Sequence, residues 1–348
     1  MDKNKWVKTF FIGSIVIILM VSGINYIVNP YNVFGHGYDK YFPNKTEILS
    51  DEMTKFYVAN RLQPKTIMIG TSRIGFFQES QLTPYLDAPI YNLALSGSSI
   101  DEQASHIEYM IKHHHIKNII WSLDFFSFNP TKPINPPFEE KRLSNDPFWN
   151  DYLISLFNLK TFNKSIETIK SNYLPSKNNT SKEVPNKEEI ELKIDYTLKE
   201  YATKEAFLKS ESFKIPSSID QKVALVKKTI AYCHEKNISV ILYTSPVYYK
   251  HIDMYYSMGL GDTFEYWKKS LANIQPYTDF CIYNSISYDM MKFRDSSHAI
   301  SNVGELVFAR IFDSKLANSS QNFGYTVTPY NINQYLNQQK RIRHDFSF

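Results

Sequence analysis

From Lys65 onward, apolar and polar residues alternate along the chain in a way that predicts strands separated by helices. Short apolar runs flanked by turn residues are typical of buried strands, and apolar residues at helical spacing are typical of amphipathic helices. Because strands that alternate with helices pair in parallel, we expect an α/β fold with about five parallel strands and helices on both faces of the sheet. The predicted strands are 66–70, 88–96, 117–128, 238–247 and 279–285, and the predicted helices are 98–115, 218–237, 263–274 and 301–316.

The alternation is interrupted between Asn129 and about Ser218, where prolines and charged residues are frequent and no strand pattern occurs. One amphipathic helix is predicted at 151–169, and the polar stretch 176–191 is typical of an exposed loop. We interpret 129–218 as an insertion into the α/β domain and as a candidate lid. The tail, 317–348, has no strong period, so no element is predicted there.

An uncharged apolar segment, Thr9 to Val28, precedes this domain. As a helix it would extend about 30 Å, which is the thickness of the hydrocarbon core of a bilayer. Lys3, Lys5 and Lys8 lie before it, so the N-terminus should stay in the cytoplasm and the rest of the chain should lie outside. A cleaved signal peptide is one alternative, although no A-x-A-like site follows, and a buried helix of a soluble protein is another. We expect an uncleaved transmembrane anchor at 1–30 and an extracytoplasmic domain at 31–348.

The composition of the 348-residue chain narrows the classes of partner and ligand. The net charge is +4, and lysines and glutamates are interspersed, so the chain lacks the basic footprint of a nucleic-acid-binding protein. The histidines at 113–115 are consecutive on a predicted helix and would point in different directions, so we expect no metal there, and no cofactor. Cys233 and Cys281 form no metal-like spacing. They are interpreted as buried small hydrophobic residues, with a disulfide as the alternative outside the cytoplasm.

Candidate chemistry lies where the predicted strands end, because parallel α/β sheets carry reactive residues at the carboxyl ends of their strands. Ser72 follows the first predicted strand, and Asp295 and His298 follow the fifth. A serine hydroxyl needs a base within hydrogen-bond reach, histidine suits this role, and a carboxylate fixes the tautomer of the imidazole. We therefore predict a catalytic triad of Ser72, His298 and Asp295. The alternative is that the Gly-Thr-Ser sequence is only a turn or a helix cap, which is its commoner role.

The same strand ends supply candidate donors for an oxyanion hole. Ser72 is expected at the N-terminus of a helix, where free backbone N–H groups can hold a developing oxyanion. Gly97, after the second predicted strand, allows a second backbone N–H to approach the same oxygen. Arg73, directly after Ser72, either binds an anionic group of the substrate or pairs with a carboxylate.

These residues resemble the sequence blocks of the SGNH, or GDSL-like, hydrolase superfamily. The resemblance spans roughly 65–316, apart from the insertion. It implies a flavodoxin-like parallel sheet with helices on both faces, and a Ser-His-Asp mechanism that passes through an acyl-enzyme. The matching residues are Gly70, Thr71 and Ser72 in the first block, Gly97 in the second, Asp295 to His298 in the D-x-x-H block, and Gly304 in the helix that follows.

The chain departs from the family pattern in two blocks. Thr71 stands where the family has the aspartate of G-D-S. The third block of the family, G-x-N-D, supplies an asparagine to the oxyanion hole, but here Asp124 lies near that place and Asn129 is the candidate substitute. We interpret Asp124, like Arg73, as a residue that supports the site from behind or contacts the substrate.

Together with the anchor, the motifs resemble membrane-anchored SGNH-like proteins of bacterial envelopes, which move acyl groups onto or off surface polymers. The resemblance implies a single-pass protein of the bacterial cytoplasmic membrane that acts as an O-acyl transferase or esterase on a cell-envelope polysaccharide or related ester. The partners it implies are the membrane, an acylated polymer or acyl donor, and a multi-pass membrane acyl-transfer protein. The irregular third block motivates the alternative of a non-catalytic SGNH-like scaffold or glycan-binding protein.

Overall fold

A computed structural model of the chain describes residues 3–45, 52–134, 138–144, 148–174, 186–204, 210–312 and 322–345. The chain divides into two compact units. Unit 1 comprises Met1–Arg61 and Glu139–Glu183, and unit 2 comprises Leu62–Phe138 and Val184–Phe348. Residues 31–61 therefore belong to the same unit as the apolar N-terminal helix, and the segment interpreted as an insertion, 129–218, is shared between the two units.

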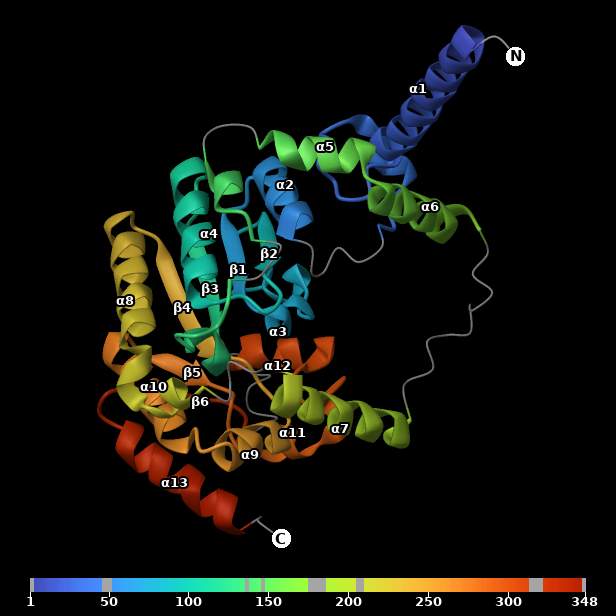
Figure 1. Cartoon of the computed structure of the whole chain (residues 1–348). Coiled ribbons are helices and arrows are strands. Elements are labelled where there is room, and N and C mark those ends of the chain that lie inside the picture. Colours follow the sequence, from blue (N-terminus) through green and yellow to red (C-terminus); the bar gives the residue numbers. More distant parts are fainter. Residues whose placement is uncertain are drawn as a thin grey trace. The chain divides into compact units, whose positions relative to one another are not determined.

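Unit 2 is built on a six-stranded sheet with the strand order β2-β1-β3-β4-β5-β6 (Figure 1). The neighbouring strands from β2 to β5 pair in parallel, whereas β6 pairs antiparallel with β5. The register aligns Gly70 with Ala94, so β1 and β2 end together at one edge of the sheet. The predicted α/β class is confirmed, but the sheet has six strands where about five parallel ones were expected, and the sixth is antiparallel. The strands are β1 Thr66–Gly70, β2 Ile90–Ala94, β3 Asn118–Leu123, β4 Ser239–Thr244, β5 Tyr277–Asp279 and β6 Tyr325–Val327.

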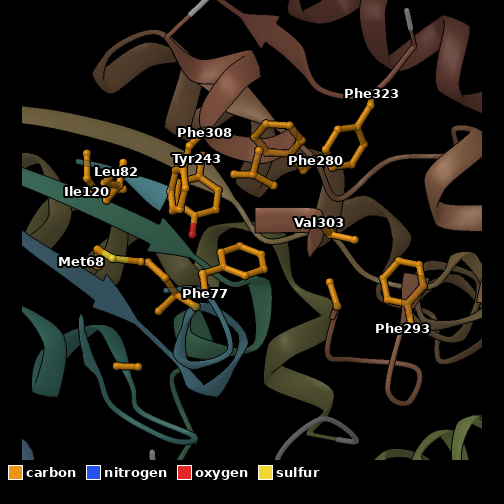
Figure 2. Packing of buried hydrophobic residues seen from close by; sticks show 14 of the residues in the cluster. Met68, Phe77, Leu82, Ile120, Tyr243, Phe280, Phe293, Val303, Phe308 and Phe323 are labelled. Carbon is orange, nitrogen blue, oxygen red and sulfur yellow. The ribbon is translucent and has the colours of Figure 1, made fainter. Parts of the chain in front are cut away.

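Helices cover both faces of this sheet, because successive strand residues point to opposite faces and both sets are apolar. On one face, Met68 of β1 and Ile120 of β3 belong to an apolar cluster with Phe308 of α12 (Figure 2). On the other face, Trp121 of β3 donates its indole N–H to Gln103 of α4 (2.8 Å). The helices of unit 2 are α3 Ser72–Gly75, α4 Ile100–His113, α7 Lys187–Lys204, α8 Asp220–Glu235, α9 Tyr249–Ser257, α10 Gly261–Ile274, α11 Ser285–Tyr288, α12 Ser301–Ile311 and α13 Ile332–Asp345.

A capping box fixes the start of α4. Ser99 accepts a hydrogen bond from the backbone N–H of Glu102 (3.4 Å), and the Glu102 carboxylate accepts one from the backbone N–H of Ser99 (2.5 Å). Both side chains are buried, so this cap fixes the chain directly after the glycine-containing turn that leaves β2.

Two expectations for the C-terminal part are wrong. The fifth strand, predicted at 279–285, is the short β5, because side chains take up the backbone N–H groups that a longer strand would use. Thr244 accepts from the N–H of Phe280 (3.0 Å), and the Asp279 carboxylate accepts from the N–H of Cys281 (3.0 Å). The tail, for which the sequence predicts no element, contains β6 and α13.

Unit 1 holds α1 Lys3–Val28, α5 Trp149–Phe157 and α6 Leu159–Tyr173, and α2 Glu52–Leu62 ends at its boundary with unit 2. Within α1, the segment Asn4–Val28 has a mean hydropathy of 2.3 and is long and apolar enough to cross a membrane. The helix predicted at 151–169 is two helices, because Asn158 ends α5 and caps α6 by accepting the N–H of Lys160 (2.7 Å). Of the loop predicted at 176–191, residues 176–185 lie outside the described residues and 187–191 begin α7.

Candidate active site

The three predicted triad residues lie in direct contact at the carboxyl edge of the sheet. Ser72 is the first residue of α3, immediately after β1, and its Oγ lies 2.8 Å from Nε2 of His298. The other ring nitrogen of His298, Nδ1, lies 2.9 Å and 3.0 Å from the two carboxylate oxygens of Asp295. Ser72 and His298 are 226 positions apart, so only the fold brings them together.

The loop that carries Asp295 and His298 is held by its own backbone. Asp295 Oδ1 accepts hydrogen bonds from the N–H groups of Ser297 (2.7 Å) and His298 (3.0 Å), and the N–H of Arg294 donates to the carbonyl of His298 (2.8 Å). Burial acts to raise the pKa of Asp295, but the hydrogen bond and charge of His298, with these N–H donors, lower it below its usual value. The carboxylate is therefore ionised at neutral pH.

The hydrogen-bond partners also define the tautomer of His298. A carboxylate can only accept, so Nδ1 carries the proton and Nε2 presents its lone pair to the Ser72 hydroxyl. The His298 and Asp295 side chains are 18% and 22% exposed, and Ser72 is half-buried, so a substrate can reach the serine from solvent.

The turn between β1 and Ser72 depends on two small residues. A Cβ on Gly70 would lie 2.7 Å from the carbonyl oxygen of Ser122, so β1 and β3 approach too closely here for any side chain. Thr71 is the N-cap of α3 and accepts from the N–H of Arg73 (3.3 Å), while its hydroxyl donates to Asp124. At the position where the family pattern has aspartate, Thr71 therefore caps α3 and binds Asp124.

The predicted oxyanion-hole residues receive unequal support. Leu95 donates its N–H to the carbonyl of Gly70 (2.9 Å), which fixes the segment after β2 against the end of β1. Gly97 follows with a left-handed backbone (φ 63°), so glycine suits this turn at the edge that carries Ser72. Asn129 is buried, and its carboxamide oxygen accepts from the N–H and the hydroxyl of Thr131 (2.8 and 2.9 Å). These contacts of Asn129 give no support to its predicted oxyanion role.

Arg73 and Asp124 form a buried ion pair behind the triad. Arg73 Nη1 lies 3.0 Å from Asp124 Oδ1, and the two side chains are 3% and 1% exposed. Burial alone would lower the pKa of Arg73, but the charge of Asp124 raises it well above its usual value, so the guanidinium stays charged. Of the two roles open from the sequence, Arg73 has the carboxylate partner, and both oxygens of Asp124 are taken up by Arg73 and Thr71.

His251, which the sequence reasoning missed, completes this buried network. Arg73 donates from Nη2 to Nε2 of His251 (3.0 Å) and from Nε to Oγ of Ser297 (3.0 Å). With Nε2 accepting, Nδ1 of His251 donates to Oγ of Ser296 (3.2 Å). Arg73 and His251 thus hold the two serines that lie between the triad residues Asp295 and His298. Only the position of His251 after the fourth strand could have indicated it, because it belongs to no recognisable motif.

The protonation of His251 follows from its surroundings. Burial, then the charges of Arg73 and His298, lower its pKa well below the usual value. His251 is therefore neutral, which is the form that can accept a hydrogen bond from the Arg73 guanidinium.

The open side of the triad carries an aromatic ring and a positive charge. The Phe76 ring packs edge-on against the His298 ring (centroids 5.2 Å apart). The exposed guanidinium of Arg294 lies 4.5 Å from the centroid of the Phe76 ring. A substrate that approaches Ser72 from solvent therefore meets a cation on this side.

Two other sets of residues singled out from the sequence lie apart from this chemistry. Within the described ranges, no three or more His, Cys, Asp or Glu residues are grouped to hold a metal ion, and His113 stacks on Tyr109 (centroids 4.3 Å apart). Cys233 and Cys281 are buried free thiols, and burial raises the pKa of each to about 12. They pack as small hydrophobic residues.

Comparison with known proteins gives no matching family model, no matching curated protein and no matching solved structure. The resemblance to SGNH-like hydrolases therefore depends on the sequence blocks and on the geometry of these residues.

Proposed function

We propose that the protein is a membrane-anchored serine O-acyl transferase or esterase with an SGNH-like catalytic unit. The observation that carries the proposal is the chain of contacts from Ser72 through His298 to Asp295, at 2.8 and 2.9 Å. Nucleophile, base and carboxylate in this order form the arrangement that activates a serine hydroxyl in acyl-transfer enzymes.

The architecture of unit 2 supports the same proposal. Its first five strands have the order 2-1-3-4-5, which is that of flavodoxin-like folds. The proposed nucleophile follows β1, next to the end of β2, and the proposed base lies on the loops that follow β5. Sites of open α/β sheets occupy this edge.

In the proposed reaction, Oγ of Ser72 forms a bond to the carbonyl carbon of an ester while its proton moves to Nε2 of His298. The electron pair of the carbonyl moves onto its oxygen. In this proposal the backbone N–H groups of Ser72 and Gly97 donate hydrogen bonds to the resulting oxyanion. When the pair returns, the bond to the alcohol breaks, and the alcohol takes the proton from His298. An acyl-Ser72 intermediate remains, and Asp295 stabilises the transient imidazolium.

The second half of the reaction decides between esterase and transferase. Water, or a hydroxyl of a cell-envelope polysaccharide, attacks the acyl group while His298 takes its proton and then returns it to Ser72. The apolar part of α1 follows Lys3, Lys5 and Lys8, which supports a Ser72 site outside the cytoplasm. Such polymers and a multi-pass acyl-transfer partner would be found there. A reporter that is active only outside the cytoplasm, fused after Phe348, should give a signal, and a signal from a cytoplasm-only reporter would contradict this topology.

The test of the proposal is labelling of the full-length protein with a fluorophosphonate probe. We expect stoichiometric labelling that is lost in Ser72→Ala and retained in the matched control Ser80→Ala, which removes an exposed hydroxyl nearby. An unlabelled but folded wild-type protein would overturn the enzyme proposal. Retained glycan binding in that protein would favour the scaffold alternative.

A further inference from the structure

Helix α5 in unit 1 has its polar and apolar faces reversed. Asp151 and Ser155 point inward and are 1% and 2% exposed. Trp149, Leu153 and Phe157, one helical turn apart from each other, point outward and are 69%, 54% and 51% exposed. A surface helix of a soluble domain shows the opposite pattern.

An ion pair fixes this orientation. Arg142, which is buried, binds both carboxylate oxygens of Asp151, with Nε–Oδ2 2.6 Å and Nη2–Oδ1 2.9 Å, and lies 3.3 Å from Glu52. Such a two-pronged pair defines both distance and angle. Turning α5 over would leave Arg142 with one carboxylate fewer and would place Asp151 in the surroundings now occupied by apolar side chains.

A second set of contacts fixes α5 at one end of the apolar helix α1. Asn25 of α1 is fully buried, donates to the carbonyl of Leu156 in α5 (2.9 Å) and accepts from the hydroxyl of Ser165 in α6 (2.9 Å). Asn25 lies within one helical turn of Val28, where α1 ends. Figure 1 shows α5 and α6 gathered at this end of α1, far from its N-terminus.

We propose that the outward face of α5 lies in the lipid headgroup layer of the membrane that α1 crosses. A span that ends near Val28 places Asn25, and with it α5, at the level where hydrocarbon meets water. Apolar and aromatic side chains on one face of a helix at this depth bind the interface. The proposal depends on α1 as a membrane span and not on the chemistry of Ser72.

The surroundings of α5 fit a lipid surface. Tryptophan and tyrosine concentrate at membrane interfaces because their rings are apolar and their N–H or O–H groups are polar. Exposed lysines beside such a face suit anionic lipid headgroups. Among the described residues of this part of unit 1, the exposed tyrosines and tryptophan are Tyr26, Tyr38, Tyr41, Trp149 and Tyr173, and exposed lysines of α6 are Lys160 and Lys170.

Trp149 provides a direct probe of this contact. Trp121 and Trp267 are fully buried in unit 2, and Trp6 lies in α1, so Trp6→Phe leaves Trp149 as the tryptophan that reports on this face. The experiment reconstitutes full-length Trp6→Phe protein in phosphatidylcholine–phosphatidylglycerol vesicles. It compares lipids brominated near the headgroup end of the acyl chain, lipids brominated near the chain end, and unbrominated lipids.

We expect Trp149 emission to be blue-shifted and largely lost with bromine near the headgroup end, with a weaker loss for bromine near the chain end. The same loss should be absent from Trp6→Phe/Trp149→Phe, the matched control. Quenching of Trp149 by aqueous iodide, without quenching by either bromolipid, would overturn the proposal because the face would lie in water. Protection from both iodide and bromine would also overturn it, since a protein would then cover the face.

Discussion

In unit 2, apolar side chains of the sheet and of α12 fill the interior, whereas in unit 1 the buried side chains of α5 and α6 are polar. Met68, Ile120 and Phe308 are fully buried in the first. In the second, the side chains that α6 buries are small and polar, and α5 buries Asp151 and Ser155. The buried residues of α6 are Thr161, Ser165 and Thr168.

The proposed contact of α5 with a membrane offers a physical explanation of this difference. Burial of apolar area stabilises a domain in water, but that term vanishes between helices surrounded by lipid, where close packing and hydrogen bonds between helices remain. Unit 2 follows the first rule. In the proposed placement, the hydrogen bonds of Asn25 with Leu156 and Ser165 lie near the membrane and follow the second rule, and the outward apolar residues of α5 contact lipid.

Unit 2 nevertheless contains one buried polar region, and it lies at the candidate active site. Arg73, Asp124 and His251 are each at most 3% exposed. Ionic groups at such depth destabilise a core unless they are fully paired. Arg73 pairs with Asp124 and Ser297, and His251 pairs with Ser296, so the network holds the loop that carries Asp295 and His298. Single substitutions can separate the proposed catalysis from the buried network of unit 2 and from the buried polar residues of α5 and α6 in unit 1.

The largest expected effect is on the proposed acyl-transfer reaction. Asp295→Asn should keep the fold but lower acyl transfer by about 10⁴-fold, as the equivalent change does in the type case of the triad, because the wrong His298 tautomer then faces Ser72. The measurement is the rate of fluorophosphonate labelling and of ester turnover. Thermal unfolding should change little. A variant that labels at the wild-type rate would remove Asp295 from the mechanism.

The next effect concerns the network behind the triad. Arg73→Met leaves the Asp124 carboxylate buried and unpaired, which should lower the free energy of unfolding of unit 2 by about 3 to 5 kcal/mol. Adding Asp124→Asn should recover part of this loss, because the stranded charge is removed. Hydrogen exchange of β1 and β3 amides provides the measurement.

A conservative variant separates positioning from stability in the same network. Arg73→Lys keeps the charge but cannot reach Asp124, His251 and Ser297 together. We expect a lower turnover number with a nearly unchanged Michaelis constant. Arg341→Lys, a change in an exposed arginine of α13, is the matched control and should leave the turnover number near wild type. Equal losses in both variants would assign no special role to Arg73.

Breaking the buried ion pair of unit 1 should lower stability by a smaller amount. Asp151→Ala removes the carboxylate that binds Arg142 through two hydrogen bonds, but Glu52 at 3.3 Å remains. We therefore expect the free energy of unfolding of unit 1 to fall by about 2 to 3 kcal/mol. Hydrogen exchange should increase in α5 and α6 and stay unchanged in the sheet of unit 2. Glu167→Ala, the control, removes a half-exposed carboxylate and should cost less than about 1 kcal/mol. Equal exchange in both variants would show that Asp151 is not needed to hold α5.

The parts of the structure that sequence predicts are those with a local pattern. The end of β1 and the D-x-x-H loop are local sequences, and the rule for parallel sheets places Ser72 and His298 at one edge. The position of β5 could not be read in this way, because the contact between Asp279 and the N–H of Cys281 ends a strand that its apolar residues would otherwise extend.

Contacts between distant segments account for the rest of what the sequence did not reveal. His251 stands 178 positions from Arg73, and no local pattern indicates a contact across that distance. The pairing of Arg142 with Glu52 across 90 positions is equally invisible, and so is the reversed orientation of α5 that it helps to fix. The oxyanion role of Asn129 stays a prediction, because that role needs its side-chain N–H groups, whereas the contact with Thr131 is made by its side-chain oxygen.

The smallest effect is a pH dependence of stability that originates at His251. Its pKa in the folded protein lies well below 6.5, while in the unfolded chain it returns to about that value. Below pH 6.5 the unfolded state therefore binds a proton that the folded state does not, so the free energy of unfolding falls as the pH falls. The slope should approach about 1.4 kcal/mol per pH unit for this one group.

The measurement is urea unfolding of unit 2 between pH 6.5 and 4.5. His251→Gln should be less stable at pH 7, but its free energy of unfolding should depend on pH less steeply, by the contribution of one proton. His234→Gln, a change in an exposed histidine, should keep the wild-type slope. Asp295 acts in a separate window: its folded pKa lies below 3.8, so its contribution is present above that pH and is lost only as the pH falls through the folded pKa. An unchanged slope in His251→Gln would show that His251 is charged in the folded protein, and Nε2 could then no longer accept from Arg73.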